Sequence, residues 1–369
     1  MLEIPSRAVQ TKLFHAFGHP TISPMSITIG VTDECNSRCA TCGIWRHSSE
    51  GPTKEFTLGE YDLAFKSIRH RPFWLTMTGG EPFLRDDLAE ICILAARQLK
   101  PGAITIPTNG SLPQIIADRT KYMLDVIDDA VLMVNLSLDG VGDKHDRIRG
   151  VPGSYERLIK TYNLLFELTR IYPNFQLGIH TVISRFNIND VTELCNLVRR
   201  LRPDTHIFEI AEERSELFNL GWNITPEADE YANTIASLRS ALENPSGRNS
   251  FMTRIIQACR LAYYQISSKE LLEGRQVIPC YAGYASCQIT PTGDVWPCCV
   301  HGCNMVMGNL RDANYDFEAV WSSEKAAKVR QFMKDGKCSC PLANAHYTSM
   351  LFDIPTVTKI VGQVLLRSL

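Results

Sequence analysis

The sequence predicts an α/β fold in which six β–α units form an open, partial (β/α)6 TIM-like barrel, followed by a cysteine-rich C-terminal region. Apolar, strand-like runs alternate with helical patterns at steps of roughly 30 residues, which is typical of a parallel sheet with crossover helices. Six such units fall short of the eight that close a full barrel. From about residue 276, Cys, Gly and Pro replace long apolar runs, so this region needs another source of stability, such as a metal cluster.

The elements follow from the pattern in chain order. Six short apolar runs predict strands at 27–31, 74–78, 103–106, 130–137, 176–183 and 206–210. Helical periodicity predicts helices at 58–69, 88–99, 155–171 and 191–201. A glycine turn in 291–299 predicts a hairpin. The expected divisions are an N-terminal extension (1–24), the barrel (25–215), a helical connection (216–275), the cysteine-rich domain (276–345) and an apolar tail (346–369).

Composition narrows the class of protein. The chain has 369 residues, a formal net charge of −2 and 44% hydrophobic residues. No basic block or basic patch with interleaved aromatic residues occurs, so we expect no nucleic-acid partner. The N-terminus lacks the pattern of a signal peptide, and no run reaches the ~18 apolar residues of a membrane span. We therefore expect a cytoplasmic protein, in which the apolar tail either docks on the body or makes a peripheral membrane contact.

The thirteen cysteines are the most informative residues. Cys35, Cys39 and Cys42 have C-x3-C-x2-C spacing, and seven more lie between residues 280 and 340. Clustered cysteines in a chain without a signal peptide indicate metal ligands. Three thiolates on one loop can hold three irons of a cubane, which leaves the fourth iron free to bind a small molecule. The remaining three cysteines are scattered and are expected to be buried structural thiols.

Polar residues follow the predicted strands, at the edge of an α/β sheet where ligands bind. Gly79, Gly80, Glu81 and Pro82 follow the second strand. Glycines allow close backbone approach to a ligand, and the Glu81 carboxylate can pair with an ammonium group. The later strands end near a further set of polar residues: Asn109, Ser137, Asp139, His180 and Glu209. Turn and cap roles are the alternative explanation for Asn, Ser and Asp at such positions.

Together, the cysteine triplet and the Gly-Gly-Glu segment resemble the radical S-adenosylmethionine (radical SAM) superfamily, over roughly residues 25–215. The resemblance implies a 4Fe–4S cluster on Cys35, Cys39 and Cys42, with S-adenosylmethionine (SAM) chelating the open iron. It implies that the segment 79–82 holds the methionine amino group. Cofactor contacts are also implied for four later residues: Asn109, Ser137, Asp139 and His180. The family's chemistry implies reductive cleavage of SAM to a 5′-deoxyadenosyl radical, an electron donor of the flavodoxin or ferredoxin type, and hydrogen abstraction from substrate.

The C-terminal cysteines resemble the SPASM domain, or its shorter twitch form, of radical SAM enzymes. The resemblance lies in Pro291-x-Gly-x-Val-x-Pro-Cys298 followed by Met307-Gly-Asn-Leu. It implies at least one auxiliary 4Fe–4S cluster, with the ligands Cys280, Cys298, Cys338 and Cys340 and the alternates Cys287, Cys299 and Cys303. The last pair departs from the family's more common C-x2-C spacing, because one residue separates Cys338 from Cys340. Four thiolates also suit zinc, which is the non-redox alternative.

The first functional hypothesis is therefore a radical SAM oxidoreductase or transferase whose auxiliary cluster assists oxidation or C–C or C–X bond formation. Its organic substrate would be lipid-linked, a sugar or a peptide. Glu209, Glu212 and Arg214 follow the sixth strand and are the catalytic candidates, for binding substrate or taking up a proton. The alternative is an iron–sulfur electron-transfer or cluster-assembly protein without substrate turnover, which explains the cysteines but not the Gly-Gly-Glu segment.

Overall fold

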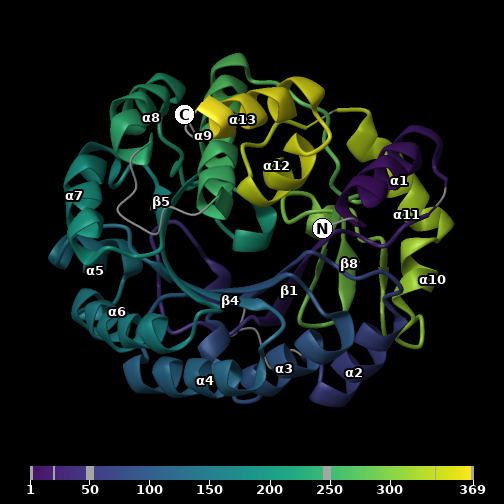
Figure 1. Cartoon of the computed structure of the whole chain (residues 1–369), viewed down its shortest axis with the longest axis horizontal. Helices are drawn as coiled ribbons and strands as arrows, with labels where there is room; N and C mark the ends of the chain where they lie inside the picture. The colour runs from purple at the N-terminus through teal and green to yellow at the C-terminus, as the bar shows by residue number, and fades with distance from the viewer. Residues whose placement is uncertain (1–2, 20, 47–53, 244–250, 337, 367–369) are drawn as a thin grey trace.

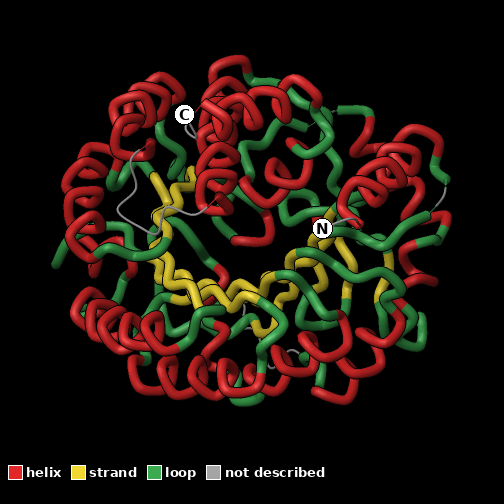
Figure 2. Tube along the Cα trace, viewed as in Figure 1, coloured by secondary structure: helices red, strands yellow, loops and turns green. Residues whose placement is uncertain are grey.

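The computed structural model describes residues 3–19, 21–46, 54–243, 251–336 and 338–366. It confirms an α/β fold built on a partial barrel of six parallel strands. These are β1 (Ser26–Thr32), β2 (Trp74–Gly79), β3 (Ala103–Thr108), β4 (Val131–Ser137), β5 (Phe175–Ile183) and β6 (Thr205–Ile210). Figure 2 shows these strands as an open arc with helices outside it. Each predicted strand matches an observed strand within two residues.

The outer helices of the barrel lie between consecutive strands (Figure 1). They are α2 (Leu58–Ser67), α3 (Leu88–Leu99), α4 (Pro113–Val126), α5 (Asp143–Arg149), α6 (Ser154–Ile171) and α7 (Val191–Leu201). Helix α2 begins with a capping box, in which the Thr57 side chain accepts from Glu60 N–H and the Glu60 carboxylate accepts from Thr57 N–H. The sequence pattern did not predict α4 or α5. Helix α5 is seven residues long and mostly charged, so it has no apolar periodicity.

The C-terminal strands extend the same sheet. Strands β7 (Ser286–Ile289), β8 (Asp294–Trp296) and β9 (Gly308–Asn309) complete the order β6-β5-β4-β3-β2-β1-β7-β8-β9. Strand β7 pairs with β1 in parallel, and β7 and β8 form the predicted hairpin, with Gly293 at φ +92° in its turn. The cysteine-rich region is therefore joined to the barrel at the strand that leads into Cys35.

The other helices cover the open side and the C-terminal strands (Figure 1). They are α1 (Glu3–Phe17), α8 (Ala228–Glu243), α9 (Phe251–Glu273), α10 (Phe317–Trp321), α11 (Glu324–Lys334), α12 (Ala343–Met350) and α13 (Ile354–Leu366). The predicted helical connection is thus α8 and α9, and residues 244–250 of it lie outside the described residues. Helix α13, in the apolar tail, packs against α9 through the buried Ile360 and Val364. No helix in the described ranges is long and apolar enough to cross a membrane.

Two groups of buried side chains form the core. The larger group joins β1 to β5 with α2, α3, α4 and α6, and it continues through β7 and Trp321 of α10. The smaller group joins β6 with α7, α8, α9, α12 and α13. The larger core therefore spans the barrel and the C-terminal strands, and the smaller one seals the side of the barrel next to β6.

Candidate active site

The candidate residues gather at the carboxyl edge of the parallel strands. The cysteine loop follows β1, the Gly-Gly-Glu segment ends β2, and Asn109 follows β3. Ser137 at the end of β4 pairs in register with His180 of β5, and Val182 pairs with Glu209 of β6. Parallel strands bring all these positions to one edge, as the sequence predicted.

The three cysteines of the first loop are partly buried and unbridged. The Ser37 N–H donates to Cys35 Sγ at 3.5 Å, and Arg149 Nη1 approaches Cys39 Sγ at 3.7 Å. Burial, with smaller contributions from the neighbouring thiols, raises the pKa of Cys35 to about 12 and that of Cys42 to about 11. Binding iron requires the thiolate form, so cluster insertion must release protons here.

Helix α5 supports the cysteine loop from below. The N–H groups of Arg38 and Ala40 donate to the carbonyls of Arg149 and Ile148 at 2.9 and 2.8 Å. Gly150 adopts φ +66°, and a Cβ on it would lie 2.2 Å from the Arg38 carbonyl oxygen. The last turn of α5 thus fixes the position of the loop through backbone contacts that only glycine permits at residue 150.

Arg149 carries a buried positive charge to this loop. Its Nη2 lies 2.8 Å from Asp139 Oδ2, and the other Asp139 oxygen accepts from Val182 N–H at 2.9 Å. The side chain of Arg149 is 12% exposed and that of Asp139 is 3% exposed. Asp139, predicted as a cofactor contact, is therefore engaged by protein groups and holds Arg149 beside Cys39.

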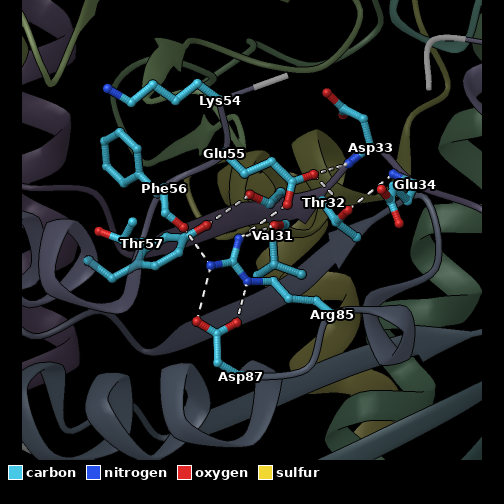
Figure 3. Close-up of polar contacts among 12 residues, drawn as sticks. Val31, Thr32, Asp33, Glu34, Lys54, Glu55, Phe56, Thr57, Arg85 and Asp87 are labelled. Atoms are coloured by element: carbon cyan, nitrogen blue, oxygen red, sulfur yellow. Dashed lines mark hydrogen bonds and ion pairs between the residues drawn. The ribbon is translucent and has the colours of Figure 1, made fainter. Parts of the chain in front are cut away.

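A second arginine fixes the start of the loop (Figure 3). Arg85 pairs with Asp87 (Nε–Oδ1 2.6 Å) and donates through Nη1 to the Val31 carbonyl at 2.7 Å. Glu55 accepts from Thr32 Oγ1 at 2.7 Å and from Asp33 N–H at 3.1 Å, and lies 3.4 Å from Arg85. This network ties the end of β1, just before Cys35, to the segment after Pro82.

The two glycines of the Gly-Gly-Glu segment allow β2 to end directly against the cysteine loop. A Cβ on Gly79, at φ +143°, would lie 2.0 Å from the Thr32 carbonyl oxygen. A Cβ on Gly80 would lie 2.1 Å from the Glu34 carbonyl oxygen, and Glu81 N–H donates to that same carbonyl at 2.7 Å. In this chain the glycines join the Cys35 loop to the cofactor-binding segment, a role that the motif alone does not reveal.

Glu81 is almost completely buried, at 1% exposure. Its Oε1 accepts from Thr108 Oγ1 at 2.7 Å and from Phe83 N–H at 3.1 Å, and its Oε2 accepts from Asn109 N–H at 2.7 Å. Burial raises the pKa of this carboxyl, and the three donors oppose that rise. The carboxylate therefore locks the ends of β2 and β3 together.

The other predicted cofactor residues have varied surroundings. The Asn109 amide donates to Asn36 Oδ1 at 2.7 Å and accepts from Ser111 N–H at 2.9 Å. His180 Nε2 lies 3.4 Å from Glu209 Oε2. Burial opposes charge on both side chains, but their mutual attraction raises the pKa of His180 and lowers that of Glu209. This pair joins a predicted cofactor residue to a predicted catalytic residue.

Four of the C-terminal cysteines are neighbours, namely Cys280, Cys298, Cys338 and Cys340. Burial raises the pKa of Cys280 to about 12, and the charges of Cys298 and Cys338 contribute. The charges of Cys280 and Cys298 likewise act on Cys340. A cavity beside them is lined by Cys280, Cys338 and Cys340 together with Glu270 and His346. Among the described residues, no group of three or more His, Cys, Asp or Glu side chains is arranged to hold a single metal ion.

The three alternates lie elsewhere. Cys287 is 3% exposed within β7 and belongs to the large hydrophobic core, whereas Cys303 is exposed. Cys299 lies 3.1 Å from Arg214 Nη1, and Arg214 lies 3.3 Å from Glu216 Oε1. Thus consecutive cysteines have different surroundings: Cys298 is near the other thiols and Cys299 is near the charged residues after β6.

Those charged residues form a buried group that we call the β6 acidic–basic group: Glu209, Glu212, Arg214 and Glu216. Burial raises the pKa of Glu212 and of Glu216 to about 7 in each case, although the Arg214 charge opposes this. Sequence analysis found three members and missed Glu216, whose position gave no signal. It also missed Arg149 and the Glu270–His346 pair, whose Oε2 and Nε2 atoms are 2.9 Å apart beside the four cysteines.

Comparison with known proteins defines the class. The family model of the radical SAM superfamily matches residues 29–198, and that of the SPASM iron–sulfur cluster-binding domain matches residues 280–341. The chain therefore belongs to the radical SAM superfamily and carries a C-terminal SPASM region. It is a radical SAM enzyme, whose cofactors are SAM, the radical SAM 4Fe–4S cluster and auxiliary SPASM iron–sulfur clusters.

Three known proteins illustrate the similarity. An AdoMet-dependent heme synthase of Oleidesulfovibrio alaskensis is 26% identical over 328 residues, 84% of this chain and 77% of the relative. The structure of Streptococcus suis SuiB bound to precursor peptide SuiA has a TM-score of 0.61 at 16% identity, covering 90% of this chain and 71% of SuiB. The structure of anSMEcpe with bound AdoMet has a TM-score of 0.60 at 14% identity, covering 93% and 94%. The two structural similarities show the shared fold.

Proposed function

We propose that the chain cleaves SAM reductively to a 5′-deoxyadenosyl radical, which then abstracts a hydrogen atom from an organic substrate. Cys35, Cys39 and Cys42 are assigned to the radical SAM cluster. The proposed SAM contacts are Gly79, Gly80, Glu81, Pro82, Asn109, Ser137, Asp139 and His180. The observation that carries the proposal is the convergence of the cysteine loop with the ends of β2 to β5 at one edge of the sheet.

Cys280, Cys298, Cys338 and Cys340 are assigned to an auxiliary 4Fe–4S cluster. Their mutual electrostatic interactions support this set over the core thiol Cys287. The single residue between Cys338 and Cys340 does not keep either of them away from the other thiols of the set. When bound, the cluster supplies a site for one-electron transfer or for substrate ligation.

Glu209, Glu212 and Arg214 are the proposed catalytic residues. They end β6 between the two cysteine groups, and Arg214 is connected to the C-terminal region through Cys299. A carboxyl group with a pKa of about 7, such as Glu212, is suited to exchanging a proton with substrate at neutral pH. This arrangement supports a net oxidation, or a bond formation that requires loss of a proton.

The substrate class is the least constrained part of the proposal. The sequence favours a lipid-linked, sugar or peptide substrate. The heme synthase similarity covers 84% of this chain, so a tetrapyrrole is the first compound to test beside them. SuiB, solved with a precursor peptide, supports including peptides.

Two further partners complete the proposal. A flavodoxin- or ferredoxin-type protein would supply the electron to the radical SAM cluster. The tail would make a peripheral membrane contact through α13, whose exposed side includes Ile354 (68% exposed), Val361 (49%) and Leu365 (59%). Sedimentation with anionic lipid vesicles tests this contact, and failure of the wild-type chain to sediment would contradict it.

The test of function is release of 5′-deoxyadenosine from SAM by the anaerobically reconstituted, reduced chain, measured by mass spectrometry. A variant with Cys35, Cys39 and Cys42 all changed to Ala should release none yet retain auxiliary-cluster absorption. Cys259→Ser, in α9, is the matched cysteine control and should behave as wild type. No release from the wild type would favour the electron-carrier alternative. Iron without matching sulfide, or zinc in its place, would contradict the auxiliary cluster assignment.

A further inference from the structure

Cys299 is a thiol that the auxiliary cluster does not require. Its neighbour Cys298 has Cys338 and Cys280 close by, whereas Cys299 receives a hydrogen bond from Arg214 Nη1 at 3.1 Å. The same guanidinium lies 3.3 Å from Glu216 Oε1. Arg214, Glu216 and Cys299 therefore form a compact polar group, which we call the thiol triad.

The thiol triad has polar capacity that the protein does not use. Glu216 Oε2 and Arg214 Nε are buried and have no hydrogen-bond partner among the described residues. The side chain of Glu216 is 11% exposed and that of Arg214 is 17% exposed. Buried polar atoms without partners are costly, so their presence here indicates a site that receives a ligand or exchanges a proton.

The thiol triad lies next to the loop assigned to the radical SAM cluster. Segment 214–219 contacts that loop: Gly43 N–H donates to the Leu217 carbonyl at 2.6 Å, and the Asn219 amide donates to the Thr41 carbonyl at 2.8 Å. A Cβ on Gly43 would lie 2.7 Å from the Phe218 carbonyl oxygen, so the two segments touch. Cys299 is thus held between the place where the radical forms and the C-terminal cysteines.

We propose that Cys299 is a hydrogen-atom donor to carbon radicals formed in this site, an inference that rests on the proposed function. An S–H bond is weaker than an unactivated C–H bond, so transfer of hydrogen from the thiol to a carbon radical is downhill. The carbon radical gains a C–H bond, the Cys299 S–H bond breaks, and a thiyl radical remains. One electron from a low-potential one-electron donor and one proton from Glu216 then restore the thiol.

The surroundings of Cys299 suit this role. The Arg214 hydrogen bond fixes the sulfur in place, and Glu216 on the same guanidinium is close enough to return the proton. Cys303, by contrast, is exposed, and Cys287 is enclosed by the hydrophobic core. Of these three alternates, Cys299 alone combines a fixed position with a proton source.

The experiment uses SAM cleavage without added substrate, in thiol-free D2O buffer with dithionite as reductant. The 5′-deoxyadenosyl radical is itself a carbon radical, and the exchanged Cys299 S–D group should give it deuterium. Wild-type 5′-deoxyadenosine should therefore be heavier by one deuterium. In Cys299→Ala and Cys299→Ser the deuterated fraction should fall several-fold, because O–D bonds are too strong to react. The matched control Cys303→Ser should retain it.

A second readout separates the donor role from cluster ligation. Cys299→Ser should keep the wild-type iron and sulfide content, whereas Cys298→Ala should lose the auxiliary share. Loss of iron from Cys299→Ser would overturn the proposal, as would deuterium that persists in Cys299→Ala or is absent from wild-type 5′-deoxyadenosine. Failure to form any 5′-deoxyadenosine would instead overturn the proposed function itself.

Discussion

Replacing Glu81 by Gln tests whether the carboxylate locks β2 to β3. Both oxygens of Glu81 accept a backbone N–H, from Phe83 and from Asn109. A glutamine amide has only one oxygen, so either orientation turns its NH2 group toward one of these donors. One buried N–H then loses its partner, and the charge of the acceptor is also lost. We expect a destabilisation of about 2–4 kcal/mol.

The assay is urea unfolding of the anaerobically purified chain, followed by circular dichroism at pH 7. Glu90→Gln removes an exposed carboxylate from α3 and should stay within about 0.5 kcal/mol of wild type. The Glu81 variant should also release less 5′-deoxyadenosine, because its Gly-Gly-Glu backbone is displaced. Equal midpoints for the Glu81 and Glu90 variants would refute the reasoning, since Glu81 could not then be the ionised acceptor of three donors.

Two other perturbations have defined outcomes. The hydrogen bond from Arg311 holds the pKa of Glu60 well below its usual range, so Glu60→Gln should cost about 1–3 kcal/mol at pH 7. This difference should shrink below about pH 4, where the unfolded carboxyl protonates and the native advantage of the charged form is lost; a constant difference would contradict it. Gly150→Ala should lower iron content per chain, because its Cβ would meet the Arg38 carbonyl. Gly153→Ala, also at positive φ but facing only the end of a flexible Arg157 side chain, is the matched control, and equal iron in both variants would count against the contact.

The sequence predicted the strands well because buried parallel strands are nearly continuous apolar runs. It also predicted the edge where Cys35, Glu81 and His180 meet, since that edge follows from strand direction alone. It could not predict α5, whose seven residues are mostly charged, and it therefore missed Arg149 beside Cys39.

Contacts between distant segments were also beyond the pattern. Arg214 and Cys299 are 85 residues apart, and nothing in either segment indicates that they meet. The same holds for the glycines of the Gly-Gly-Glu segment. Their close approach to Thr32 and Glu34 depends on how β1 and β2 end side by side. Motif spacing thus indicated the chemistry, while the surroundings that tune it required the fold.

The pairing of β1 with β7 has a consequence for how the chain is made. Ser26 pairs with Ser286, so one edge of β1 stays open until nearly the whole polypeptide has left the ribosome. An unpaired strand edge is a template for aggregation, and such distant pairing slows folding. A chain truncated before residue 286 would keep Cys35, Cys39 and Cys42 but leave the strand that leads into them without its neighbour. The nascent protein is therefore most vulnerable to misassembly late in its synthesis, after the barrel sequence is complete.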